Sequence, residues 1–177
     1  TGWTGKFAAG SLYLDLRRMN RIVEINEKNM YAVVEPYVIT AQLQAELMKR
    51  GLHLNVKGAG SNCTAMLRGH GHLDQSTSGD DRNHLAIEWV TPAREIVRTG
   101  SLGSNEEWFC GDGPGPSLRS ILTSATPPGA TPGVFTQAAM KVYHWPGPRQ
   151  FPIEGVSPNY SLREIPPNFM ARYFSFS

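Results

Sequence analysis

Glycine and proline are distributed unevenly along this chain, and their positions limit the fold more than any other sequence feature. The 18 Gly and 13 Pro residues concentrate between Gly58 and Gly79, between Gly100 and Gly133, and after Trp145. Ordering long glycine-rich loops costs conformational entropy, so such loops in a compact domain usually serve a ligand or a close backbone approach. We therefore expect short regular elements that carry functional loops.

Several short segments have the period-two alternation or the apolar content typical of strands. Pro36 ends one of them, because proline cannot donate to a ladder. Residues 91–94 join two others into a hairpin, since Pro92 suits the second position of a type I turn. The predicted strands are residues 12–16, 22–26, 31–35, 52–56, 85–90, 95–99 and 134–143.

Two helices are predicted between these strands. The first covers residues 41–50, with Thr40 as its N-cap and Gly51 as its stop. The second is short and covers residues 117–124, with Ser117 as its N-cap. Strands and helices do not alternate regularly, which predicts an α+β fold. Leu43, Leu47 and Met48 share one face of the first helix. We expect Leu43 and Leu47 to pack in the core with Val33, Ile87 and Val97.

Charge and composition exclude several classes of function. The 177 residues carry a net charge of +2, with 17 basic residues scattered among 15 acidic ones, so nucleic-acid binding is not expected. No apolar run approaches the roughly 20 residues that span a bilayer, so no transmembrane segment is predicted. Cys63 and Cys110 are too few for a disulfide framework, which favours a soluble protein in the cytoplasm.

Two common ligand motifs are missing from the sequence. A phosphate-binding loop needs a Lys followed by Ser or Thr after its last glycine, whereas residues 2–7 (GWTGKF) end in Phe after the Lys. The histidines lack a paired-Cys or His-Glu-x-x-His arrangement, so no metal site is predicted.

A series of motifs in a fixed order points to a known family. Residues 14–25 read LDLRRMNRIVEI, residues 32–38 read AVVEPYV, and Arg98-Thr99-Gly100 follows the predicted hairpin. Further along, NEEW at 105–108 precedes GPGP, and GVFTQ begins at Gly133. Together these motifs resemble the PCMH-type FAD-binding domain of the vanillyl-alcohol oxidase and para-cresol methylhydroxylase superfamily, which includes glycolate oxidase and D-lactate dehydrogenase-like FAD-linked oxidases. The resemblance covers residues 1–146.

The resemblance implies FAD as the cofactor, bound noncovalently, and it implies where FAD would bind. Residues 1–2 would end the loop around the pyrophosphate, and residues 58–71 would form the second flavin loop, where absent Cβ atoms allow close backbone approach. The implied cofactor-binding residues are Thr1, Gly2, Gly58, Gly60, Ser61, Cys63, Thr64, Gly69, Gly71, Gly79, Gly133 and Val134.

Plainer interpretations stand beside these assignments. Cys63 could be a small buried hydrophobe, as unpaired cysteines often are. Gly133 and Val134 could simply begin a strand. His72 and Asp74 are candidates for proton transfer, because histidine titrates near neutrality, but both could be ordinary loop hydrogen-bonding residues.

The resemblance also implies a domain organisation and an activity. Residues 1–146 would be the FAD-binding domain, mostly its second subdomain and without its N-terminal part, residues 147–171 a Pro-rich linker, and residues 172–177 the start of a C-terminal cap. The chain would then be a fragment of a larger FAD-dependent oxidase or dehydrogenase that transfers a hydride from an alcohol, a 2-hydroxy acid or a para-substituted phenol to flavin. Its partners would be that small-molecule substrate and an electron-acceptor protein or other subunit. The alternative is a non-catalytic flavin-domain scaffold or an electron-transfer subunit of a larger complex.

Overall fold

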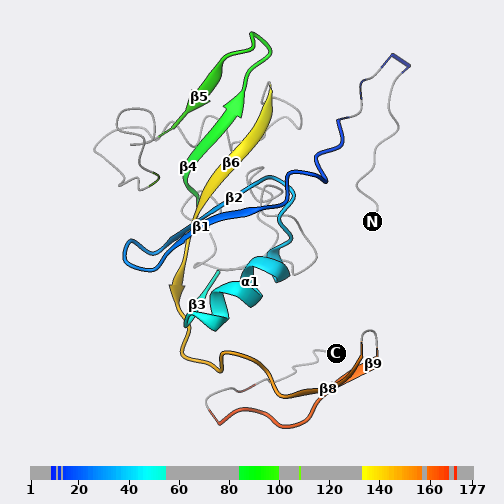
Figure 1. Cartoon of the computed structure of the whole chain (residues 1–177), viewed down its shortest axis with the longest axis vertical. Coiled ribbons are helices and arrows are strands. Elements are labelled where there is room, and N and C mark those ends of the chain that lie inside the picture. Colours follow the sequence, from blue (N-terminus) through cyan, green and yellow to red (C-terminus); the bar gives the residue numbers. More distant parts are fainter. Residues whose placement is uncertain are drawn as a thin grey trace, which may run out of the picture.

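The structure is a computed structural model of the whole chain, and Figure 1 shows a twisted sheet, one helix beside it and a separate hairpin toward the C-terminal end. The description that follows covers residues 9–10, 12, 14–54, 84–99, 108, 133–156, 159–167 and 170. Within those residues, no helix has the length and apolar character needed to cross a membrane.

The main sheet has five strands in the order β1-β2-β6-β4-β5, and every neighbouring pair is antiparallel. Its strands are β1 (Ile22–Asn26), β2 (Tyr31–Val34), β6 (Val134–Lys141), β4 (His84–Val90) and β5 (Ile96–Arg98). Because β6 lies between β2 and β4, the C-terminal part of the sequence joins the two halves of the sheet. The mixture of strands and helix confirms the predicted α+β class.

The two faces of the sheet bury different side chains, as the period-two geometry of strands requires. In β2, Ala32 and Val34 belong to the larger core cluster, whereas Tyr31 and Val33 belong to a second cluster on the opposite face. The larger cluster also contains the helix residues Leu43 and Leu47, so it marks the face that the helix covers. The predicted core residues are confirmed: four are fully buried and Val97 packs against the larger cluster at half-burial.

The helix α1 (Thr40–Lys49) lies where the sequence predicts it. Its start differs by one residue, because Ile39 is the N-cap and makes no side-chain capping bond, while Thr40 is the first helical residue and is buried. Thr40 is therefore wrong as the predicted N-cap. Gly51 has φ +71°, a left-handed conformation that glycine adopts without steric cost, which confirms it as the residue that stops the helix.

Two small sheets complete the described fold. Strand β3 (Leu52–His53) pairs with β7 (Tyr143–His144), and β8 (Ile153–Val156) pairs with β9 (Asn159–Leu162). The β8–β9 hairpin lies inside the segment predicted as a Pro-rich linker, so that segment contains regular structure. The division of the chain into domains stays a prediction.

Three predicted elements differ from the structure. Residues 14–16 of the predicted strand at 12–16 are not a strand, because the Asp15 carboxylate accepts a hydrogen bond from the Arg17 backbone N–H at 2.9 Å and turns the chain. The predicted strand at 52–56 ends at His53 in the part of it that is described. The predicted strand at 134–143 is divided at Val142, which lies between β6 and β7 and donates its N–H to the Met30 carbonyl at 3.0 Å. The predicted helix at 117–124 lies outside the described residues.

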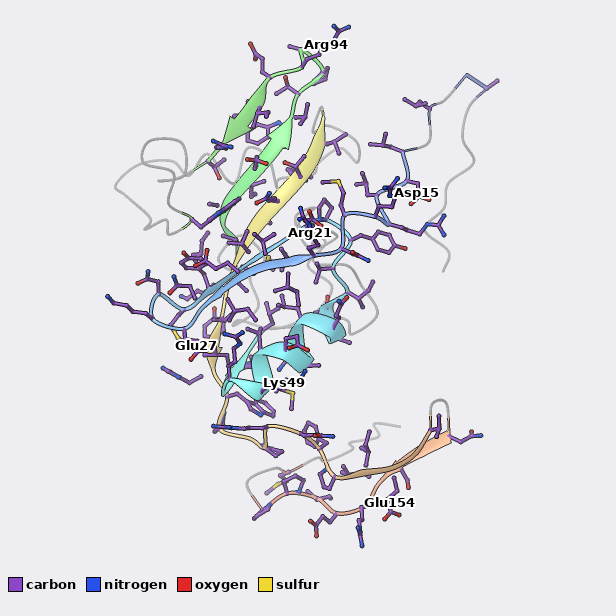
Figure 2. All side chains as sticks on the ribbon, in the orientation of Figure 1. Asp15, Arg21, Glu27, Lys49, Arg94 and Glu154 are labelled. Carbon is purple, nitrogen blue, oxygen red and sulfur yellow. The ribbon has the colours of Figure 1, made fainter. Side chains whose placement is uncertain are left out.

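The predicted hairpin between β4 and β5 is confirmed. The Arg94 N–H donates to the Thr91 carbonyl at 2.9 Å, which places Pro92 at the second position of the turn. Arg94 has φ 68°, the left-handed position that follows the turn in three-residue hairpin loops. Figure 2 shows Arg94 at the tip of this hairpin, far from α1.

Candidate functional site

Most of the cofactor-binding residues implied by the sequence lie outside the described residues. The described ones are Gly133 and Val134, which begin β6. The residues outside the description are Thr1, Gly2, Gly58, Gly60, Ser61, Cys63, Thr64, Gly69, Gly71, Gly79 and the two proton-transfer candidates His72 and Asp74.

Gly133 enters the sheet through a very close backbone approach. It has φ +118°, and a Cβ atom added there would lie 2.2 Å from the Val90 carbonyl oxygen and 3.2 Å from the Thr91 Cα. A side chain would therefore collide with the end of β4, where Val134 pairs with Val90. Strand packing alone accounts for this glycine, as the plainer interpretation held, and contact of Gly133 and Val134 with FAD stays a prediction.

Thr99, in the Arg-Thr-Gly motif, extends the β4–β5 pairing with its side chain. The Ile87 N–H donates to Thr99 Oγ1 at 2.9 Å, and the Thr99 N–H donates to the Ile87 carbonyl at 3.0 Å. The hydroxyl takes the place of a backbone acceptor for a buried N–H group. Thr99 therefore fixes the point at which the chain leaves β5 for the second glycine-rich stretch.

A polar chain crosses three strands on the face opposite α1. Arg98 Nε donates to Glu88 Oε2 at 2.8 Å, and the Thr136 hydroxyl donates to Glu88 Oε1 at 2.8 Å. Glu88 alternates with Ile87 and Trp89, which belong to the helix-side cluster, so its side chain points to the other face. These bonds tie the Arg98 motif on β5 to the GVFTQ segment on β6.

Arg21 and Glu35 join the first two sequence motifs. The Arg21 backbone N–H donates to Glu35 Oε2 at 2.8 Å, and its guanidinium Nη2 lies 2.7 Å from Oε1. The Glu35 N–H donates in turn to the Arg21 carbonyl at 3.0 Å, and Figure 2 shows Arg21 over this part of the sheet. Hydrogen bonds from Arg21 hold the pKa of the Glu35 carboxyl below its ordinary value. The motifs drew attention to both residues, but nothing in their spacing revealed the pairing.

Side chains hydrogen-bond both backbone polar groups of Leu54, which lies shortly before the first glycine-rich stretch. The Leu54 N–H donates to Gln44 Oε1 of α1 at 2.9 Å, and the Leu54 carbonyl lies 3.0 Å from His53 Nδ1. Sequence reasoning missed this contact, because Gln44 lies on a helix whose apolar residues alone were informative.

The two glycine-rich stretches, residues 58–79 and 100–133, are followed by strands that begin at opposite ends of the β4–β6 pair. In the β4–β6 pairing, His84 is opposite Met140, whereas Val90 is opposite Val134. The chain thus enters β4 at one end of this strand pair and enters β6 at the other end. If residues 58–71 and Gly133 and Val134 all bind FAD, as the resemblance implies, we expect them to face the same ligand; residues 58–71 lie outside the description, so this stays a prediction. Among the described residues, no group of three or more His, Cys, Asp or Glu side chains could hold a metal ion.

The chain matches known proteins in sequence. A family model described as an FAD binding domain matches residues 1–100. The 1'-carboxy-chondrochloren decarboxylase of Chondromyces crocatus is 30% identical over 155 residues, covering 81% of this chain and 27% of that protein. The D-2-hydroxyglutarate dehydrogenase of Stutzerimonas stutzeri is 27% identical over 152 residues, covering 82% and 32%.

Solved structures share the fold. The 4-ethylphenol oxidase from Gulosibacter chungangensis aligns with a TM-score of 0.60 and 26% identity, covering 72% of this chain and 25% of that one. For p-cresol methylhydroxylase the TM-score is 0.57 at 24% identity, covering 75% and 26%, which is a likeness of fold alone. The chain spans about a quarter to a third of the length of these proteins.

Proposed function

This chain belongs to the family of FAD binding domains, and from that premise we propose that it forms part of the FAD site of an FAD-dependent oxidoreductase. The observation that carries the proposal is the family match over residues 1–100, which includes the first two strands, α1 and the first glycine-rich stretch. The fold supports it, because 4-ethylphenol oxidase aligns with 72% of this chain at a TM-score of 0.60.

Of the residues proposed to bind FAD, the described part of the chain contains Gly133 and Val134. When bound, FAD would supply the acceptor for a hydride, and the protein would supply binding, orientation and electrostatics. The residues proposed to hold it are the glycines and hydroxyl side chains of 58–71, whose backbone N–H groups can approach phosphate oxygens closely. The described residues support the main sheet. Gly133 allows β6 to approach the end of β4 closely, and the Thr99 hydroxyl binds the Ile87 N–H just after β5.

The proposed substrate is an alcohol, a 2-hydroxy acid or a para-substituted phenol that loses a hydride from a C–H bond. The names of D-2-hydroxyglutarate dehydrogenase and 4-ethylphenol oxidase support the last two classes. Fold alone does not determine the reaction, since the relatives also include a decarboxylase. An electron-accepting protein or other subunit and a cytoplasmic location belong to the same proposal.

The test is a spectrum followed by a substrate panel. The intact protein should be purified with visible flavin absorption, and chromatography of the flavin released by acid should identify FAD. Anaerobic addition of a 2-hydroxy acid, a primary alcohol or a 4-alkylphenol should then bleach the visible bands for one class. A protein that neither carries flavin nor takes up added FAD would contradict the proposal.

The second candidate is a flavin-domain scaffold or electron-transfer subunit without its own substrate. It rests on the fold, because a fold shared with p-cresol methylhydroxylase does not by itself imply a shared reaction. The same experiment separates the two candidates: FAD that is bound but bleached by no member of the panel, and only by a redox partner protein, favours the second.

A further inference from the structure

Trp145 directly follows β7, the strand that pairs with β3. Its backbone N–H donates to the Gly51 carbonyl at 2.8 Å, at the point where α1 has ended. The centroid of its ring lies 5.7 Å from that of His53 on β3 and 6.4 Å from that of Phe151, which meets it edge-on. One residue therefore contacts the end of α1, strand β3 and the segment that leads to the β8–β9 hairpin.

The chain after Trp145 closes around its indole ring. The indole Nε1–H donates to the Pro148 carbonyl at 2.8 Å. Gly147 lies against the same ring, because a Cβ atom added there would be 2.5 Å from Trp145 Cε2 and 2.9 Å from Nε1. Gly147 does not have a positive φ, so its backbone conformation is open to other residues. The indole is thus what requires glycine at this position.

The hairpin beyond this turn is held together mainly by its own contacts. Strands β8 and β9 pair along their whole length and pack chiefly against each other. The Arg163 N–H donates to the Pro152 carbonyl at 2.8 Å, and the Arg163 guanidinium lies 3.2 Å from the Glu154 carboxylate. Ile153 and Val156 are exposed, so little apolar burial stabilises the hairpin. A two-stranded hairpin alone is only marginally stable in water, so its position depends on how the preceding residues are attached.

The main sheet does not share this dependence. Its central strands bury side chains on both faces, in two clusters that contain residues of β2, β4 and β6. Among the described residues, neither cluster includes a position from 145 onward. Proteins open locally in cooperative units, and segments with few buried apolar contacts open most readily. Residues 145–156 and 159–163 have the features of such a unit, and we call them the latched segment.

We propose that Trp145 is a latch: its indole holds the latched segment against the end of α1 and against β3, and the segment opens as one unit while the main sheet stays folded. The inference concerns a conformational device of the fold and does not depend on FAD. If Trp145 were an ordinary part of the core instead, the latched segment would open only when the whole domain unfolds.

The experiment is hydrogen–deuterium exchange with mass spectrometry on the intact protein, as wild type, Trp145→Leu, Gly147→Ala and the double variant. Leucine at position 145 removes the ring and its donor. Alanine at position 147 keeps the ring but displaces it, so the two substitutions release the latch in different ways. Trp108→Leu is the matched control, since it makes the same chemical change at a residue that packs against the second core cluster of the main sheet.

Backbone amides of β8 and β9 should exchange about tenfold faster in Trp145→Leu and in Gly147→Ala, the factor expected for one lost hydrogen bond with its ring contacts. Amides of β2 and β6 should exchange as in wild type. In the Trp145→Leu background, Gly147→Ala should add less than about twofold, because the ring that it displaces is already absent. Trp108→Leu should leave exchange in β8 and β9 unchanged.

Wild-type exchange of β8 and β9 in Gly147→Ala would overturn the inference, and so would additive effects of the two substitutions. An equal acceleration in β2 and β6, or faster exchange of β8 and β9 in Trp108→Leu, would show that the latched segment is not a separate unit. If Trp145→Leu does not fold, Trp145→Phe, which keeps a ring and loses the Nε1 donor, takes its place. Failure of both to fold would also overturn the inference, because Trp145 would then be needed for the whole domain.

Discussion

At several positions in this domain, contacts with neighbouring groups determine which side chain the position needs. Gly133 must lack a Cβ atom because the Val90 carbonyl occupies its place. The Thr99 hydroxyl accepts the buried Ile87 N–H at 2.9 Å. Glu35 must be charged because Arg21 contacts it through both backbone and side chain. All three positions lie in the motifs that led to the family, and the physical reason for each is local.

Gly133→Ala should destabilise the protein more than an alanine at another glycine with positive φ. At Gly51, φ is +71° and nothing lies within 4 Å of an added Cβ, so Gly51→Ala should cost only about 1–2 kcal/mol for the left-handed conformation. At Gly133 the same substitution also forces backbone apart at 2.2 Å, and we expect an additional loss of about 1–3 kcal/mol. Urea denaturation of the FAD-free protein measures both. Equal losses at the two positions would show that β4 and β6 do not approach this closely.

The Arg21–Glu35 pair should make stability depend on pH in the acid range. The folded-state pKa of Glu35 lies below its ordinary value of 4.5, because Arg21 hydrogen-bonds the ionised form. The unfolded chain therefore binds the proton first, so this contribution is complete above about pH 4.5 and is lost as the pH falls through the folded-state pKa. Denaturation midpoints of wild type and Glu35→Gln should differ at neutral pH and converge on acidification.

The control for this pH dependence is Glu46→Gln, which removes an exposed pair with Lys49. Exposed pairs of this kind contribute about 0–1 kcal/mol, so Glu46→Gln should have little effect at any pH. A Glu35→Gln variant with the same acid profile as wild type would contradict the role assigned to Arg21.

At the scale of elements, α1 is attached to the sheet mainly through a narrow apolar face. Leu43 and Leu47 are fully buried one turn apart, and both belong to the cluster that contains β2, β4 and β6 residues. Leu47→Ala should lower the free energy of unfolding by about 2–5 kcal/mol, through lost apolar burial and the cavity left behind. Gln42→Ala on the exposed side should change it by about 0.5 kcal/mol or less. A loss below about 1 kcal/mol for Leu47→Ala would mean that α1 is not packed as described.

The elements also show what the sequence could predict and why. The helix was predicted to within one residue, because Leu43, Leu47 and Gly51 are local signals of face and stop. The segment at 14–16 was predicted as a strand because its apolar alternation is genuine, but the Asp15 side chain turns the backbone and its neighbour Leu14 remains 53% exposed. The β8–β9 hairpin was missed because prolines on either side suggested irregular chain.

The candidate site was predictable only in part, for a related reason. Family motifs are read along the chain, whereas Gln44–Leu54, Thr136–Glu88 and Arg21–Glu35 are contacts between residues separated by 10, 48 and 14 positions. Period and composition reveal which segments form strands, but not which side chain satisfies a given buried N–H group. Those partners depend on register, and the register depends on bulges such as the one between Glu88 and Trp89.

At the scale of the whole molecule, the central part of the sheet is buried on both faces. On the face away from α1, Val33, Ala86 and Ala139 are fully buried in the second cluster, against which Trp108 packs. By contrast, Ile153 and Val156 of the β8–β9 hairpin are 53% and 81% exposed, and isolated two-stranded hairpins are marginally stable. The described chain therefore combines a packed sheet with a weakly supported hairpin.

At the same scale, the family resemblance predicts how tightly residues 1–177 bind FAD without the rest of the protein. The chain spans about a quarter to a third of the length of its relatives. In the family, two loops contact the pyrophosphate, and the resemblance implies that residues 1–2 end the first loop and that residues 58–71 form the second. We expect residues 1–177 alone to bind FAD orders of magnitude more weakly than the intact protein. Each lost backbone donor contributes about 0.5–1.5 kcal/mol, and more toward a charged phosphate.

Calorimetric titration with FAD compares the affinity of residues 1–177 with that of the intact protein. Acid precipitation of the intact holoprotein tests whether FAD is bound noncovalently. Noncovalent binding predicts that the yellow colour stays in the supernatant and that the stripped protein rebinds FAD. Exposed Ile153, Val156 and Met170 should also make the isolated piece self-associate more than the intact protein, which light scattering detects. Equal affinity of the piece and the intact protein would mean that residues 1–177 hold the whole cofactor site, and the division of pyrophosphate contacts inferred from the family would then be wrong.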